Sequence, residues 1–184
     1  MAFSYTNRKG KSYYLHAHKT RRRKVRYVFA RSIGDGALDE IPPGYEVREN
    51  INGQVTLGKV RPRLISEIEE RAVRSELARL SLDSYRVDVK DSAIVVYEPE
   101  GGADLPSSFT FLPTRLRMGA ARGRNYRPVM RFVLVDAETR TFRLERMTYR
   151  GEGGWSWPLD HGKIGKLARK ALPHLGQESF FELL

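Results

Sequence analysis

The sequence predicts an α+β fold of antiparallel β-hairpins, with about eight short strands, one central helix and one or two C-terminal helices. Two observations support this prediction. Short runs rich in aromatic and β-branched residues recur along the 184-residue chain, and turn-forming residues separate them. The chain also lacks the regular alternation of strand and helix that produces a parallel sheet.

Four strands are expected in the first sixty residues. Residues 12–18 and 25–30 alternate in the manner of half-buried strands, and the polar run 19–24 between them predicts a turn with a basic tip. Residues 45–48 and 54–59 form a second hairpin around an Asn- and Gly-containing turn.

A helix is expected over residues 67–80. Ser66 and Glu69 have the spacing of a capping box, and acidic residues in the first turn complement the helix dipole. Its apolar stripe at helical spacing consists of Ile65, Ile68, Ala72, Val73, Leu77 and Leu80.

The rest of the chain predicts further hairpins and a helical end. The expected strands are residues 85–90, 93–98, 109–112, 129–135 and 141–149. A helix capped by Asp160 should end near Pro173, and a short amphipathic helix over 177–184 should bury Phe180, Phe181 and Leu184. Trp155 and Trp157 should close one end of the core.

The predicted elements divide into a basic β-hairpin module over residues 1–62 and an α+β domain over 63–184, with a single domain as the alternative. No apolar run near the N-terminus is long enough for the hydrophobic segment of a signal peptide, and no apolar stretch is long enough for a transmembrane helix. A cytoplasmic location without membrane association is therefore the expectation. The sequence does not indicate an oligomeric state.

Positive charge is concentrated at one end of the sequence. The net charge is +11, and residues 1–31 contain ten basic and no acidic side chains. Residues 63–100, by contrast, hold nine acidic and six basic residues. Such a field attracts polyanions, so DNA or RNA is the expected partner, and an acidic protein is the alternative.

The candidate interface is the first predicted hairpin, where cations would grip phosphates and a tyrosine would stack on bases. A two-stranded ribbon of this kind fits the major groove of DNA. The expected nucleic-acid-binding residues are Lys9, Lys11, Tyr14, Arg21, Arg22, Arg23, Lys24, Arg26, Arg122 and Arg124.

Two of these residues belong to a second Arg-rich segment, which has two interpretations. It could be another phosphate-binding loop, or its arginines could pair with the acidic residues of 63–100 inside the fold. Its six arginines are Arg115, Arg117, Arg122, Arg124, Arg127 and Arg131.

Catalytic and metal-binding chemistry have weak support. The chain has no cysteine, which excludes disulfides, thiolate metal sites and cysteine nucleophiles. His16 and His18 lie on one face of the first strand and could hold zinc with His161 or His174, or act as base and acid in phosphodiester cleavage. We expect no catalytic residue, no metal and no cofactor, with two exposed polar histidines as the simpler reading.

Three stretches in the first third of the chain, residues 7–16, 26–30 and 37–46, resemble the start of some bacterial proteins of unknown function. That resemblance implies no activity. More loosely, a basic hairpin beside a helix is similar to the arm-type DNA-binding domain of tyrosine integrases, which has a three-stranded sheet and one helix. This similarity implies DNA binding, although four strands are predicted here.

The sequence therefore favours a non-enzymatic nucleic-acid-binding protein that uses a basic N-terminal hairpin. An accessory protein that docks an acidic protein partner is the second hypothesis. A nuclease using His16 and His18 is the third.

Overall fold

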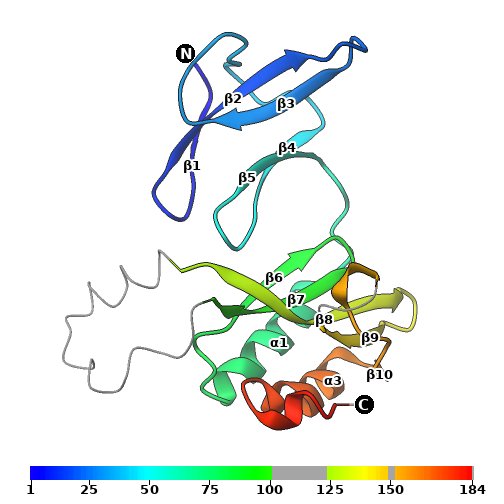
Figure 1. The fold of residues 1–184 in the computed structure, drawn as a ribbon. Coiled ribbons are helices and arrows are strands. Elements are labelled where there is room, and N and C mark those ends of the chain that lie inside the picture. Colours follow the sequence, from blue (N-terminus) through cyan, green and yellow to red (C-terminus); the bar gives the residue numbers. More distant parts are fainter. Residues whose placement is uncertain (101–123, 149–151, 184) are drawn as a thin grey trace, which may run out of the picture. The chain divides into compact units, whose positions relative to one another are not determined.

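The computed structural model describes residues 1–100, 124–148 and 152–183. The expected strand over 109–112 lies outside these residues, as do Arg115, Arg117, Arg122 and Leu184. The α+β class is confirmed, because antiparallel sheets and helices make up the fold (Figure 1). The described residues form two compact units: 1–61 with 124–125, and 62–100 with 126–148 and 152–183. None of the described helices is long and apolar enough to span a membrane.

The first unit contains two antiparallel sheets (Figure 1). One has the strand order β1-β2-β3, with β1 at Ser4–Thr6, β2 at Ser12–Lys19 and β3 at Val25–Ala30. The other pairs β4 at Tyr45–Glu49 with β5 at Val55–Lys59. Strand β1 was not expected, because three residues are too few to show an alternating pattern.

Strand β2 is paired along both edges. Beyond the short β1, the chain after β3 returns and takes the free edge of β2, where the Ala17 amide donates to the Gly36 carbonyl at 2.8 Å and the Leu38 amide to the Leu15 carbonyl at 2.8 Å. Gly36 has φ +82°, and a Cβ there would lie 2.6 Å from the Ala17 carbonyl oxygen. Glycine is therefore required at this close approach.

The second unit is built on a five-stranded antiparallel sheet with the order β10-β9-β8-β7-β6. Its strands are β6 at Arg86–Lys90, β7 at Ala93–Pro99, β8 at Tyr126–Asp136, β9 at Thr141–Arg146 and β10 at Asp160–Gly162. Each strand pairs with its neighbour in sequence, so the sheet is a simple meander.

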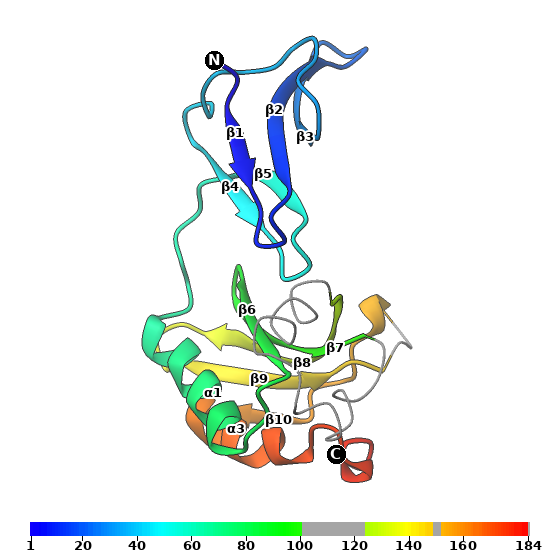
Figure 2. The same cartoon turned by 90° about the vertical axis from the view of Figure 1, so that its left-hand side faces the viewer.

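Two helices cover one face of this sheet: α1 at Glu67–Arg79 and α3 at Ile164–Ala171 (Figure 2). They pack on the apolar side chains of the strands, which the alternation of a half-buried sheet directs toward them. The largest fully buried side chains of this core are Ile65, Val73, Ile94, Val96, Met130, Phe132, Phe142, Leu144, Leu167 and Leu172.

Helix α1 has the predicted start and, apart from Ile68, the predicted buried face. The Glu69 amide donates to Ser66 Oγ at 3.4 Å, and the Ser66 amide donates to Glu69 Oε2 at 2.8 Å, which completes the capping box. Ile68 was expected in the apolar stripe, but its side chain is 76% exposed. Glu69 is buried instead, because Arg140 from the β8–β9 turn donates to its carboxylate.

The C-terminal part departs from the prediction in three places. Asp160 does not cap a helix: it begins strand β10, and Lys163 is the N-cap of α3. Beyond α3, short 3-10 helices at Leu172–His174 and Glu178–Phe180 replace the expected amphipathic helix, and Phe181 is 73% exposed. Trp157 does not close the core, because its side chain is 91% exposed. A further 3-10 turn spans Glu152–Gly154.

The two apolar residues Ile68 and Leu77 of α1 should differ sharply in their contribution to stability. Leu77 is 6% exposed, so Leu77→Ala should lower the free energy of unfolding by about 2–5 kcal/mol. Ile68→Ala should change it by less than about 0.5 kcal/mol, because the side chain is already in water. Urea unfolding followed by circular dichroism measures both. Equal losses would contradict the burial of α1 described above.

The Glu69–Arg140 ion pair should make stability depend on acid pH. Burial raises the pKa of Glu69, but hydrogen bonds from Arg140 and Ser66 outweigh it and lower the pKa below 4.5. A lowered pKa in the folded state stabilises the fold above the ordinary pKa, and this stabilisation is lost as the pH falls through the folded value. Glu69→Gln should therefore destabilise the protein at pH 7 and less so at pH 3. Glu67→Gln, an exposed change in the same helical turn, is the control and should show a smaller difference.

Candidate nucleic-acid interface

The hairpin of β2 and β3 ends in a projecting segment, His18–Arg26, that we call the basic arm. All nine of its residues are exposed. The strands pair His18 with Arg26 and Lys19 with Val25 before the turn begins. Because a strand advances about 3.3 Å per residue, the backbone extends roughly 7 Å from His18 to Thr20, where the turn begins.

The turn at the tip of the basic arm is held by its own hydrogen bonds. The Thr20 amide donates to the Lys24 carbonyl at 2.8 Å, and the Arg23 amide donates to the Thr20 carbonyl at 2.8 Å. The Lys24 amide donates to Thr20 Oγ1 at 3.2 Å. Arg23 completes the turn with a φ of 58°, which lies in the left-handed region. Residues other than Gly, Asn and Asp are strained in that region.

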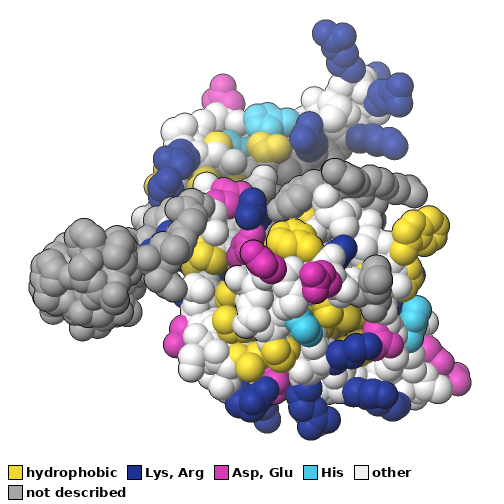
Figure 3. All heavy atoms as spheres, turned by 60° about the horizontal axis from the view of Figure 1, so that its bottom comes forward, with side chains coloured by type: hydrophobic (Ala, Val, Ile, Leu, Met, Phe, Trp, Pro, Cys, Tyr) yellow, Lys and Arg dark blue, Asp and Glu magenta, His cyan; other side chains and the backbone are white. Residues whose placement is uncertain are grey.

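The cations of the basic arm have no carboxylate partners among the described residues. They are Lys19, Arg21, Arg22, Arg23, Lys24 and Arg26. Basic side chains elsewhere are commonly paired: Arg8 with Glu49 at 2.9 Å and Arg79 with Glu76 at 2.6 Å are examples from the two units. On the face of the second unit turned forward in Figure 3, basic, acidic and apolar side chains are interspersed. The basic arm therefore gathers six exposed cations within eight residues, and none of them has a carboxylate partner in the described part of the chain.

His16 is buried, so the expectation of two exposed histidines is wrong for this residue. Its side chain is 3% exposed, the Gly34 amide donates to its Nε2 at 3.2 Å, and its Nδ1 lies 3.0 Å from the Tyr14 carbonyl oxygen. Since Nε2 accepts, the proton sits on Nδ1 and is donated to that carbonyl. Both ring nitrogens are thus used by the backbone, and His16 has none left for a metal or a substrate.

His18 shares a face with His16 but not its surroundings. The two rings stack at 6.1 Å between centroids, and His18 is exposed beside Arg26 at the base of the arm. The described residues contain no group of three His, Asp or Glu side chains that could hold a metal ion. His161 and His174, the other proposed zinc ligands, belong to the second unit, where His174 Nδ1 lies 2.8 Å from Ser179 Oγ. The two rings lie side by side because His16 and His18 are alternate residues on one face of β2.

Lys9 and Lys11 lie at the opposite end of β2 from the basic arm. They belong to the β1–β2 loop, where Asn7 Oδ1 accepts from the Lys9 amide at 3.1 Å and the Lys11 amide at 2.9 Å. Eight residues separate Lys11 from Lys19, a distance of roughly 26 Å along a strand. The structure therefore divides the expected interface into two sites.

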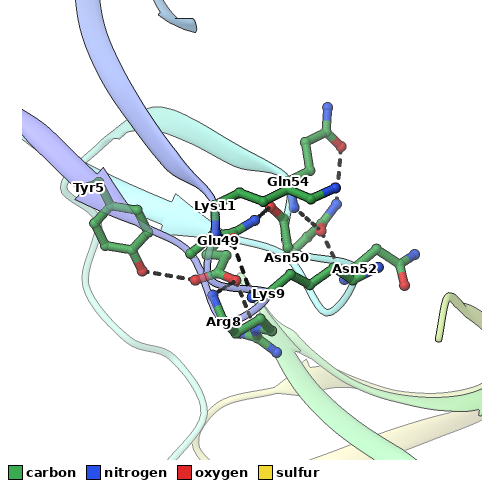
Figure 4. A network of polar contacts seen from close by, with 10 residues as sticks. Tyr5, Arg8, Lys9, Lys11, Glu49, Asn50, Asn52 and Gln54 are labelled. Atoms are coloured by element: carbon green, nitrogen blue, oxygen red, sulfur yellow. Dashed lines mark hydrogen bonds and ion pairs between the residues drawn. The ribbon is translucent and has the colours of Figure 1, made fainter. Parts of the chain in front are cut away.

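Asn7 and Glu49 hold the β1–β2 loop against the β4–β5 hairpin, and Figure 4 shows Glu49 between Tyr5 and Arg8. Asn7 is 4% exposed and donates to the Gly53 carbonyl at 2.6 Å. Glu49 accepts from the Tyr5 hydroxyl, the Arg8 amide and Arg8 Nε, each at 2.9 Å. The hydrogen bond to Glu49, together with burial, raises the pKa of the Tyr5 hydroxyl. These contacts tie the two sheets of the first unit together.

Tyr14 and Arg124 occupy other places. Tyr14 is half-buried in the middle of the sheet, opposite Ala30, and four residues separate it from His18 on the same face. Arg124 is half-buried outside regular structure. Neither belongs to the basic arm.

Two arginines from the second Arg-rich segment lie on β8 in ion pairs. Arg127 contacts Glu98 on β7 at 2.6 Å, and Glu98 belongs to the acidic segment that the sequence suggested as partner. Arg131 contacts Glu145 on β9 at 2.5 Å and stacks on the Trp155 ring at 4.3 Å from its centroid. Both arginines are part of the second unit's sheet.

Comparisons with protein-family models, curated proteins and solved structures gave no match to this chain. The similarity to the arm-type domain of tyrosine integrases also meets a difference in the fold. The first unit has a three-stranded sheet, but α1 belongs to the second unit and no helix occurs among residues 1–61.

Arg23→Gly should remove one charge from the basic arm without destabilising its turn. Glycine adopts the positive φ of this position without strain, so the variant should unfold at the same or higher temperature, with a gain of up to about 1 kcal/mol. Arg23→Val, which removes the same charge, should loosen the turn because a β-branched residue disfavours that φ. Amide hydrogen exchange at Lys24 and thermal unfolding would measure the difference. If the glycine variant unfolded at a lower temperature than the unchanged protein, the positive φ described for residue 23 would be wrong.

Proposed function

We propose that this protein binds nucleic acid, without catalysing a reaction, through the six cations of the basic arm. The observation that carries the proposal is that these cations are exposed, adjacent and without carboxylate partners in the described part of the chain. Six cations on one short hairpin do not stabilise the folded state, because neighbouring cations repel each other. A polyanion would relieve that repulsion by binding.

Phosphate contact accounts for the composition of the basic arm. Each phosphate that a cation neutralises releases condensed counterions, and this release drives binding at low salt. Four of the six cations are arginines, whose planar guanidinium groups bind phosphate oxygens in pairs. The turn at Thr20 holds them at one end of the hairpin, so their positions are set before binding.

The salt dependence of binding to a 20-base-pair DNA duplex should report the number of these contacts. If all six cations neutralise phosphates, the slope of log affinity against log salt should be about −5. Arg21→Ala/Arg22→Ala should reduce its magnitude by about 2, because two phosphate contacts disappear. Fluorescence anisotropy titrations at salt concentrations from about 50 to about 200 mM give the slope for the unchanged protein and for the variant.

A matched control separates the site from the overall charge. Lys166→Ala/Arg169→Ala removes two exposed cations from α3 and therefore changes the net charge equally. This variant should keep the slope of the unchanged protein. Equal losses in the two double variants would show that binding follows net charge alone. Absence of binding at low salt, or displacement by an equal charge of poly-glutamate, would overturn the proposal and favour an acidic protein partner.

A further inference from the structure

We infer that the basic arm enters the major groove of B-form duplex DNA and holds the phosphates on its two edges. This inference rests on the proposed function and adds the class of nucleic acid and the mode of contact. It follows from three properties of the arm: its width, the absence of a stacking surface on it, and the placement of its cations.

The dimensions of the basic arm match that groove. Paired strands lie about 4.8 Å apart, and with side chains on both of its faces a two-stranded ribbon fills a groove roughly 12 Å wide. The groove is roughly 8.5 Å deep, a depth that the arm spans beyond His18 with its strand ends, its turn and the long arginine side chains at its tip. The tip at Arg21 and Arg22 can therefore approach the floor, while Lys19 and Arg26, which the alternation places on opposite faces of the ribbon, face the two phosphate walls.

The arm has no surface on which unpaired bases could stack. Apart from His18 it carries no aromatic ring, and single-strand binding draws its affinity from stacking on such rings. Of the tyrosines on β2 and β3, Tyr27 contacts the Tyr45 ring at 5.1 Å between centroids, and the Arg31 guanidinium lies 5.8 Å over Tyr13. Tyr14 is half-buried opposite Ala30, away from the arm. The arm is thus built to contact backbone phosphates and groove edges.

An A-form duplex does not offer the same site. Its major groove is deep and narrow, so side chains do not reach into it, and double-stranded RNA is instead bound across a wide minor groove. A projecting ribbon with its cations at the tip and edges suits the B-form groove better than that shallow surface.

The test compares four ligands of one 20-mer sequence with the full chain: duplex DNA, duplex RNA, single-stranded DNA, and duplex DNA with glucosylated 5-hydroxymethylcytosine. The glucose fills the major groove and leaves the phosphate charge unchanged. We expect the plain DNA duplex to bind at least tenfold more tightly than each of the other three. Netropsin, which occupies the minor groove, should not displace the protein.

The tryptophans provide a second readout of the same binding. Both lie in the second unit, and the side chain of Trp157 is 91% exposed. If the arm carries the contact, duplex DNA should leave the tryptophan fluorescence unchanged and Trp157→Ala should bind normally. Quenching by single-stranded DNA that Trp157→Ala abolishes would show that bases stack on this residue instead.

The outcomes distinguish the inference from the function on which it rests. Equal affinity for plain and glucosylated duplexes, with the salt slope still reduced by Arg21→Ala/Arg22→Ala, would overturn groove insertion but leave phosphate binding by the arm in place. Preference for duplex RNA or single strands would also overturn it. Failure to bind any of the four ligands would overturn both.

Discussion

The antiparallel register of β2 with β3 is the constraint on which the rest of the first unit depends. Because side chains alternate along a strand, pairing His16 with Val28 also fixes His18 opposite Arg26 and Lys19 opposite Val25. A slip of one residue would move His16 and Leu15 to the wrong faces, and both are buried. Burial at the inner end of the hairpin therefore sets which side chains stand together at the outer end.

The returning chain reinforces that register from the other edge of β2. Gly36 approaches Ala17 so closely that no side chain fits between them, and the Gly34 amide is bonded to His16. A central strand with both edges paired has little freedom to shift. The basic arm thus projects from the most firmly paired part of the first unit, which limits how its cations can move.

The sequence predicted most elements, because hairpin turns and a capping box are local signals. It missed β1 and β10, which have three residues each and depend on neighbouring strands. It placed Ile68 in the core because helical spacing cannot foresee that Arg140, 71 residues further on, would draw Glu69 inward. For the candidate site, the prediction included the cations of the arm together with Lys9 and Lys11. It grouped them because a count of charge along the chain does not show which residues lie close together in space. The Asn7-Arg-Lys-Gly10 turn was the one sequence signal that could have pointed to the anchoring role of Asn7.

The exposure of the basic arm separates two kinds of constraint on this protein. Residues 18–26 bury nothing, so the hydrophobic core does not restrict which side chains occupy them. Within the arm only the turn sets requirements, through the hydroxyl of Thr20 and the backbone angle at residue 23. Related chains could therefore keep the same scaffold while the reach, charge and ligand preference of the hairpin diverge.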